Sequence, residues 1–119
     1  MVEFVTYTGL RKRREFLRVQ KFGRRFRRRS LVLLVLQNSA EHPRVGFTVS
    51  KRVGNAVTRN RVRRRLREMV RYCSGDLCSG MDYVFIALPK TAHAEFAVLC
   101  KELTSLVGEV QKWASHRES

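Results

Sequence analysis

The chain has 119 residues, 44% of them hydrophobic, and a formal net charge of +15 from 25 basic and 10 acidic residues. This length and composition fit a single domain over residues 1–119 and exclude a chain that is disordered throughout. The longest apolar run, residues 31–36, is too short to span a bilayer, and the N-terminus lacks the hydrophobic core of a signal peptide. We therefore expect a cytoplasmic protein with no membrane partner.

A helix is predicted over residues 10–22, with Thr8 as its candidate cap. Its inward-facing residues are expected to be Leu10, Phe16 and Val19. Gly23 ends the helix or starts a turn, and residues 24–30 (RRFRRRS) are predicted to form a basic connector.

The next segment, SLVLLVLQ at residues 30–37, is typical of a buried strand, and the polar residues 38–43 predict a turn. Residues 44–51 (RVGFTVSK) then alternate, which predicts a second strand with two unlike faces. The core face is expected to carry Val45, Phe47 and Val49. The opposite face carries Gly46, Thr48 and Ser50, whose small polar side chains leave room for an extended ligand.

Residues 51–71 hold nine Lys or Arg residues and a single acid, Glu68. The apolar residues Val62, Leu66, Met69, Val70 and Cys73 recur at intervals that fit one face of a helix. We therefore expect an ordered helix that runs to about Cys73, capped by Asn55 or Thr58, with a buried back and a cationic front. Arg outnumbers Lys in the chain, and its planar fork binds phosphate through two donors, so a phosphate backbone is the predicted partner.

The C-terminal third predicts a loop at residues 74–81, a strand at 82–90 and a helix from Thr91 to about Ala114, followed by frayed residues 115–119. The apolar face of this helix is expected to contain Phe96, Leu99, Cys100, Leu103, Leu106, Val107 and Val110. The element order is α-β-β-α-β-α, which indicates an α+β layer with helices packed against one sheet.

No catalytic constellation is evident from the sequence. The three histidines are scattered, and the three cysteines match no metal-ligand spacing, so we expect neither catalytic nor metal-binding side chains on this chain. Asp76 and Asp82 could form a paired-carboxylate site for a protein-only nuclease, but both are expected to be solvated turn residues. Reduced thiols fit a cytosolic environment best.

The run RVGFTVSKRVGNAVTRNRVRRRLREMVR closely resembles the protein subunit of bacterial ribonuclease P, whose signature is an Arg-Asn-Arg core in a basic helix. LRKRREFLRVQKFG resembles the first helix of that family and GMDYVFIALPK its later strand, so the resemblance covers about residues 9–113. It implies an α–β sandwich with a left-handed crossover between parallel strands. It also implies a ribonucleoprotein that removes the 5′ leader of precursor tRNA, in which the RNA subunit, with bound Mg²⁺, performs the hydrolysis.

The resemblance assigns two groups of residues. Those expected to contact the catalytic RNA are Lys51, Arg52, Asn55, Arg59, Asn60, Arg61, Arg64, Arg65 and Arg67. Those expected to bind the single-stranded leader are Phe16, Gln20, Thr48 and Ser50. The chain departs from the family at Gln20, where a second aromatic residue is common, so weaker leader discrimination is expected there.

Three alternatives stay open. A ribosomal protein or RNA chaperone would use the same charges on structural RNA, and a protein-only nuclease would use Asp76 and Asp82. A DNA-binding regulator would place the helix at residues 58–73 in a major groove. The role of the arginine run from Arg24 to Arg29 is also open between RNA contacts and a solvated charge run.

Overall fold

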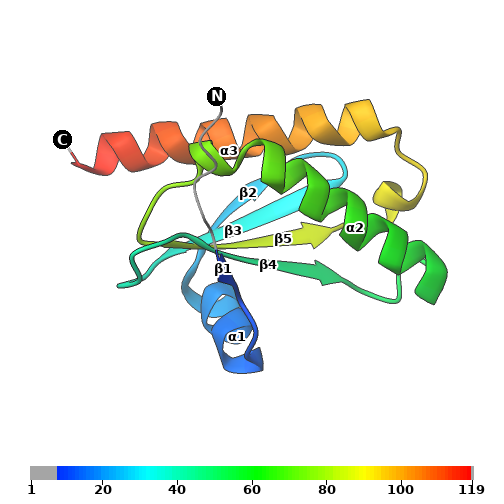
Figure 1. The fold of residues 1–119 in the computed structure, drawn as a ribbon, viewed down its shortest axis with the longest axis horizontal. Helices are drawn as coiled ribbons and strands as arrows, with labels where there is room; N and C mark the ends of the chain where they lie inside the picture. The colour runs from blue at the N-terminus through cyan, green and yellow to red at the C-terminus, as the bar shows by residue number, and fades with distance from the viewer. Residues whose placement is uncertain (1–7, 119) are drawn as a thin grey trace.

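The computed structural model describes residues 8–118, whose backbone forms three layers (Figure 1). Within this range a five-stranded sheet forms the middle layer, in the order β1–β4–β5–β3–β2. The strands are β1 (Thr8–Gly9), β2 (Arg24–Arg27), β3 (Leu31–Gln37), β4 (Arg44–Val49) and β5 (Met81–Ala87). Helix α1 (Arg13–Phe22) crosses one face, whereas α2 (Ala56–Tyr72) and α3 (Phe96–Glu118) cover the other.

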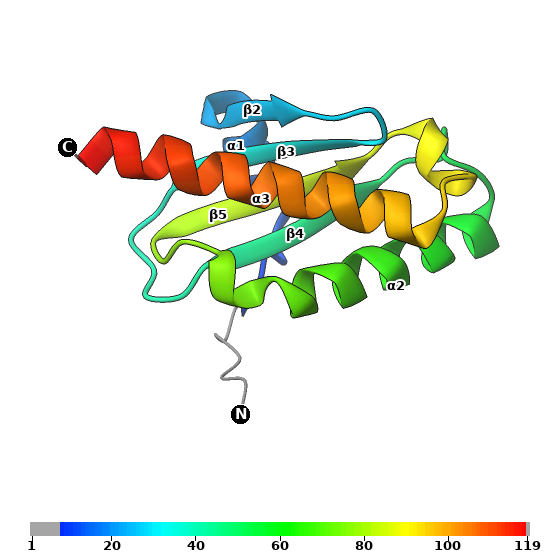
Figure 2. The ribbon, with the colours of Figure 1, turned by 90° about the horizontal axis from the view of Figure 1, so that it is seen from above.

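Strand β4 is parallel to β5 and to β1, whereas β3 is antiparallel to both β5 and β2. The chain leaves β4, runs back along α2 and the short 3-10 helix η1 (Ser74–Asp76), and enters β5 beside β4. This β4–α2–β5 crossover is left-handed, as Figures 1 and 2 together show, although right-handed crossovers are the rule for parallel strands. The α+β sandwich and its unusual crossover are therefore as expected.

The larger core lies between the sheet and the pair α2 and α3 (Figure 2). Because side chains alternate along a strand, β3 and β5 present every second residue to this layer, including Leu33, Tyr83 and Phe85. Leu66 of α2 and Leu103 of α3 pack against them with no exposed surface. Burying a side chain of this size contributes about 1.5–3 kcal/mol, so this layer holds the fold together.

A smaller cluster lies on the other face, under α1. Val32, Leu34 and Val84 of the sheet pack against Val19 of α1 and against Leu10, which precedes the helix. The half-buried residues at its edge are Phe16, Leu36, Ile86 and Leu88. β3 and β5 are thus apolar on both faces, which explains why their sequences read as nearly continuous hydrophobic runs.

The structure corrects several expectations. Residues 24–27 are not part of a connector but form an edge strand, β2, paired with β3. The cap of α1 is Lys12 rather than Thr8, which lies in β1, and the carboxylate of Glu15 accepts hydrogen bonds from the backbone N–H groups of Arg11 and Lys12. These additions change the expected element order by two strands, β1 and β2.

The last helix also differs from its prediction. A 3-10 helix, η2 (Pro89–Ala92), precedes it, so α3 begins at Phe96 instead of Thr91 and continues to Glu118 through residues expected to fray. Phe96 is exposed, not inward-facing, because it occupies the first helical position, where no neighbouring element covers it. The other predicted inward residues of α3 are buried or, for Cys100, half-buried.

Candidate nucleic-acid interface

Helix α2 forms as predicted. It is held in place by its buried apolar side and by a capping hydrogen bond at its N-terminus. Val62, Leu66, Met69 and Val70 are buried, which leaves the remaining faces of the helix to polar side chains. The side chain of Asn55 caps the helix by accepting a hydrogen bond from the backbone N–H of Thr58 at 2.9 Å. The side-chain oxygen of Asn55 therefore serves as the helix cap. This cap fixes the start of α2 and with it the positions of the basic residues that follow.

One flank of α2 faces strand β4. Arg63 donates to the carbonyl oxygen of Val49 at 3.4 Å and to Oδ1 of Asn60 at 3.3 Å. Arg63 and Arg67 line a hollow of about 240 Å³. The rest of its lining comes from Gly9, Leu10, Phe16, Val45, Gly46 and Phe47. Two cations and two aromatic rings thus meet at the edge of β4.

The opposite flank of α2 faces α3 and η2. Arg61 donates to the carbonyl oxygen of Ala92 at 3.0 Å, whereas Arg65 is half-buried without a hydrogen bond or ion pair in the described part of the chain. Arg59 is also half-buried, and its Nε is a buried donor with no partner among residues 8–118. A buried donor without a partner is costly, so a bound acceptor at this point would be stabilising.

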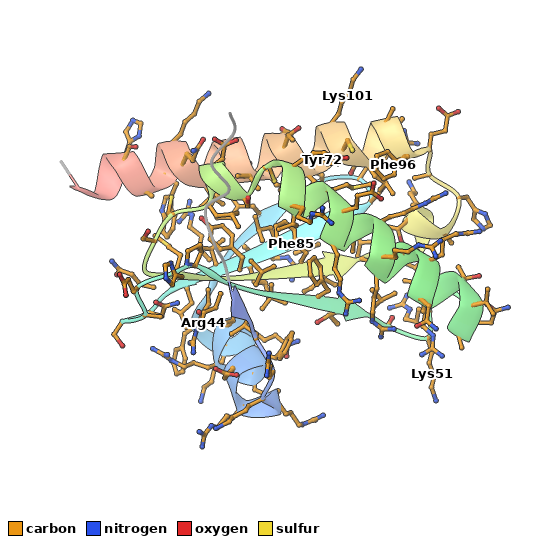
Figure 3. All side chains as sticks on the ribbon, in the orientation of Figure 1. Arg44, Lys51, Tyr72, Phe85, Phe96 and Lys101 are labelled. Atoms are coloured by element: carbon orange, nitrogen blue, oxygen red, sulfur yellow. The ribbon has the colours of Figure 1, made fainter. Side chains whose placement is uncertain are left out.

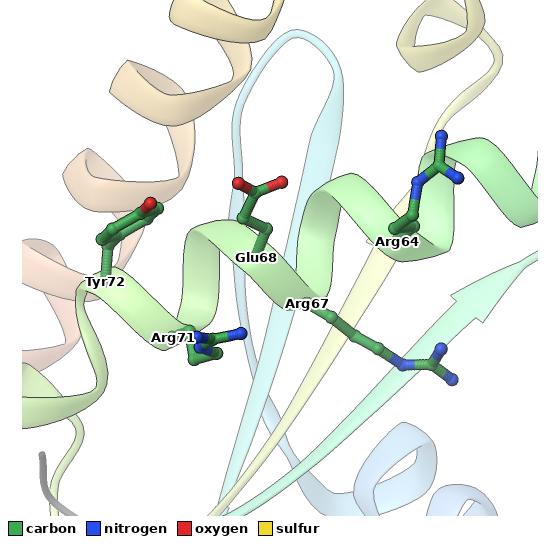
Figure 4. A pocket seen from close by; sticks show the side chains of 5 residues that line it. All are labelled: Arg64, Arg67, Glu68, Arg71 and Tyr72. Carbon is green, nitrogen blue, oxygen red and sulfur yellow. The ribbon is translucent and has the colours of Figure 1, made fainter.

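The outward face of α2 carries Arg64, Arg71 and the aromatic ring of Tyr72, which is 79% exposed. With Arg67 and Glu68 they surround an open hollow of about 430 Å³ (Figure 4). In this view Glu68 and Arg64 point to one side of the helix and Arg67 to the other, toward β4. The sequence reasoning did not assign Arg63, Arg71 or Tyr72 to the site, although a helical projection continued to the end of α2 would have included them.

Lys51 and Arg52 lie in the turn between β4 and α2, and both are exposed. The turn is closed by hydrogen bonds from the N–H of Val53 to the carbonyl of Ser50 and from that of Gly54 to the carbonyl of Lys51. In Figure 3 Lys51 points away from the sheet. These two cations extend the basic surface beyond the N-terminus of α2.

The residues assigned to the leader lie on the α1 side of the sheet. The ring of Phe16 covers Gly46 so closely that a Cβ at Gly46 would lie 2.5 Å from Cε1 of Phe16, so any larger residue there would displace the ring. Thr48, one pair of residues further along β4, is half-buried on the same face, and Gln20 is exposed. Ser50 follows the strand and is exposed. The structure thus brings Phe16 and β4 together, with Gln20 one helical turn along α1.

Asp82 is a structural residue, contrary to the expectation of a solvated turn. It is 1% exposed at the start of β5 and receives hydrogen bonds from Asn38 and, at 2.7 Å on each oxygen, from Arg44. Arg44 also contacts Glu15 of α1 at 2.8 Å, and its hydrogen bonds to Asp82 raise its pKa. The Asp82 carboxylate is fully engaged, so it does not form a catalytic pair with the exposed Asp76.

The described residues offer no metal centre of their own. Across residues 8–118 no cluster of three or more His, Cys, Asp or Glu side chains could hold a metal ion. The three cysteines have free thiols, and burial raises the pKa of Cys73 to about 11. The described side chains therefore do not form a Mg²⁺ site by themselves.

The fold and the surface together define an α+β protein whose crossover helix is rich in arginine, a surface typical of nucleic-acid-binding proteins. A family model described as Ribonuclease P matches residues 4–111. The chain therefore belongs to the ribonuclease P protein family, which supplies the protein component of that tRNA-processing endoribonuclease.

Individual relatives agree with this assignment. The chain is 39% identical to the ribonuclease P protein component of Clostridioides difficile over 107 residues, which cover 89% of this chain and 94% of that protein. It is 37% identical to that of Syntrophus aciditrophicus over 98 residues, or 82% of each chain. Among solved structures, the RNase P protein of Staphylococcus aureus aligns with a TM-score of 0.79 at 26% identity, covering 86% of this chain and 94% of that one. The Thermotoga maritima protein aligns with a TM-score of 0.76 at 30% identity, covering 82% and 93%.

Proposed function

We propose that this chain binds the catalytic RNA subunit of ribonuclease P through α2 and the preceding turn, and the 5′ leader of precursor tRNA through α1 and β4. The RNA subunit, which holds most of the Mg²⁺, cleaves the phosphodiester bond, and the protein strengthens substrate binding. The whole domain, residues 1–119 with a core at about 9–113, would act in the cytoplasm. Among the described residues no helix is long and apolar enough to cross a membrane.

The observation that carries this proposal is that the arginines of α2 are not neutralised by ion pairs within the described chain. The ion pairs within residues 8–118 involve Arg28 and Arg44, and none involves an arginine of α2. The helix has one acid, Glu68, among its basic residues. A rigid helix with this many unneutralised guanidinium groups is destabilised by self-repulsion, and RNA phosphates relieve that repulsion on binding.

The leader site follows from the hollow beside β4. Phe16 offers a ring on which a base can stack, and such stacking contributes about 1–3 kcal/mol per base without requiring a particular sequence. Arg63 and Arg67 line the same hollow and supply cations for the adjacent phosphates. The hydroxyl group of Thr48 is available on the same sheet face. A single strand threaded here would lie between α1 and the RNA-binding helix.

Reconstitution at low Mg²⁺ tests this function. The protein, mixed with the RNA subunit and precursor tRNA, should greatly increase cleavage over the RNA subunit alone, while the protein without RNA should cleave nothing. A ribosomal protein or general RNA chaperone would give no such increase. Cleavage by the RNA-free protein that disappears in Asp76→Asn, at an exposed carboxylate, would instead support a protein nuclease.

A second test concerns two neighbouring arginines of α2, Arg64 on its outward face and Arg65 on the flank toward α3. Arg64→Ala/Arg65→Ala should weaken binding to the RNA subunit and lower the slope of log affinity against log salt by about 0.9 for each phosphate that the variant no longer neutralises. Because neither arginine bonds to another described residue, the melting temperature should not fall. Lys101→Ala/Lys112→Ala removes the same charge from exposed positions on α3 and should leave RNA affinity and slope close to wild type.

A further inference from the structure

Side chains alternate between the two faces of strand β2, so the arginines of residues 24–29 do not all point the same way. Phe26 faces α3, where it is buried and meets the ring of Trp113 edge-on at 5.8 Å. Arg24 shares that face, since its guanidinium lies 5.7 Å from the Phe26 ring centre and 5.5 Å from that of Trp113. Side chains alternate along a strand, so Arg25 and Arg27 face the opposite side, where α1 lies.

The two groups of arginines differ in their partners. Arg28, just after the strand, donates to Oγ of Ser105 at 3.0 Å and forms an ion pair with Glu109 at 2.8 Å, which ties the end of β2 to α3. Arg25 and Arg27 are exposed and their side chains have no hydrogen bond or ion pair with any other described residue. The first group therefore stabilises the fold, and the second is available to a ligand.

The pairing of the strands places Arg27 in line with the leader site. Thr48 of β4 pairs with Ile86 of β5, Ile86 with Val32 of β3, and Val32 with Arg27 of β2. All four belong to the α1 face of the sheet, and this row crosses four strands. Three strand spacings of about 4.8 Å give about 14 Å from Thr48 to Arg27. Arg25 precedes Arg27 by two residues on the same face of β2. It pairs with Leu34 and lies nearer to α1.

We infer that Arg25 and Arg27 bind phosphates of the single-stranded leader upstream of the nucleotide at Phe16. The inference rests on the proposed function, because it requires a leader bound beside Phe16 and Thr48. A stacked strand advances about 3.4 Å per nucleotide, so 14 Å corresponds to about four nucleotides. Ile86 of this row is half-buried at the margin of the α1-side cluster, whereas Val32 beyond it is 1% exposed. A leader that contacts the sheet at Thr48 and Ile86 would therefore pass above the covered Val32 before its phosphates meet the exposed arginines of β2.

Affinity for substrates with different leaders tests the inference in the assembled enzyme. We compare the wild-type protein with Arg25→Gln/Arg27→Gln, using precursor tRNAs with leaders of about two and about eight nucleotides, shorter and longer than the row. For the long leader the variant should bind about fivefold to tenfold more weakly, the effect of two exposed charge pairs. Its salt slope should fall by about 1.4, or 0.7 per single-strand phosphate. The short leader should bind equally well to both proteins.

Three controls separate the possible outcomes. Arg25→Lys/Arg27→Lys keeps the charges and should restore most of the long-leader affinity, and Lys101→Gln/Lys112→Gln removes two charges elsewhere and should leave it unchanged. The melting temperature of the Gln variant should match wild type, since neither arginine has a partner within the described chain. Arg24→Gln/Arg28→Gln should instead lower the melting temperature.

Two results would overturn the inference while leaving the proposed function intact. One is an unchanged long-leader affinity in the Gln variant, and the other is a loss of affinity for the isolated RNA subunit, which would place Arg25 and Arg27 on that RNA. Failure of the proposed function looks different, because the wild-type protein would then fail to enhance cleavage of either substrate.

Discussion

On the face of the sheet covered by α2 and α3, the side chains are buried in a continuous apolar layer that includes Tyr83, Phe85 and Leu66. On the face crossed by α1, the cluster is small, and Phe16, Ile86 and Leu88 at its margin stay partly exposed. The first face contributes most of the folding free energy, since that term grows with buried apolar area. The second can accept a ligand because one helix leaves part of the sheet uncovered.

The largest effect is expected on the first face. Leu66→Asp would place an unpaired charge at a position with 0% exposure, which costs more than about 4 kcal/mol and should unfold the protein. Loss of the cooperative thermal transition, followed by circular dichroism, checks this. Leu66→Met, of similar volume, should cost less than about 1.5 kcal/mol. A folded Leu66→Asp protein would show that α2 is not anchored by its apolar side.

Phe16 provides the matching test on the second face. Phe16→Leu keeps an apolar side chain at this half-buried position and should change the free energy of unfolding by about 1 kcal/mol or less. It removes the ring, so the leader-dependent part of substrate affinity should fall by about 1–3 kcal/mol. Urea denaturation and substrate binding measure the two quantities separately. If stability drops and leader affinity does not, Phe16 is a packing residue and the contrast between the faces is lost.

A substitution at Gln20 should strengthen leader binding on the α1 face of the sheet. Gln20 is exposed one helical turn after Phe16, and Gln20→Phe would add a second ring beside the leader path. Selectivity for precursor over mature tRNA should rise by about 1 kcal/mol, the lower end of base stacking. Gln20→Leu adds apolar surface without a ring and should give a smaller gain. Unchanged selectivity in Gln20→Phe would show that the leader does not pass this turn of α1.

The smallest effect concerns the attachment of α1. Backbone hydrogen bonds from Lys12, and then from Arg11, together with the nearby Arg44 guanidinium, lower the pKa of Glu15 against the opposing effect of burial. A carboxylate whose pKa is lower in the folded state stabilises the fold above its unfolded pKa, and loses that contribution as the pH falls through the folded pKa. In urea denaturation, the stability of wild type relative to Glu15→Gln should therefore be constant above the ordinary glutamate pKa of 4.5 and should decrease as the pH falls below it.

The sequence predicted those elements whose own residues determine their structure. The periodicity of Val62, Leu66 and Met69 indicated α2, and the apolar runs indicated β3 and β5, because burial of these side chains is what forms the elements. Strand β2 was missed because RRFR has a single apolar residue, and its strand conformation comes from backbone pairing with β3. The pairing is a hairpin across residues 28–30, but the arginines on either side of Phe26 hide the strand pattern.

The site shows the same division. The spacing of the apolar residues predicted the helix, and the family motif assigned its basic residues. Their separation into a flank toward β4 and a flank toward α3 depends on how the helix packs. Asp82 was expected in a solvated turn because Asp76 and Asp82 straddle a segment predicted to be a flexible loop. Its partner Arg44 is 38 residues earlier in the chain, at the start of the parallel strand beside it, so the buried ion pair forms only in the fold.

The open margins of the sheet have a consequence for handling the protein without RNA. Within residues 8–118, β1 pairs only with Arg44 and Val45, which leaves the rest of β4 as one free edge, and β2 forms the other. Free edges invite strand pairing between molecules, and here Arg63, bonded to the Val49 carbonyl, and the arginines of β2 make such pairing repulsive. Concentrated salt screens this repulsion beyond a few ångströms, so we expect aggregation of the isolated protein to increase at high ionic strength, even where anions raise its melting temperature.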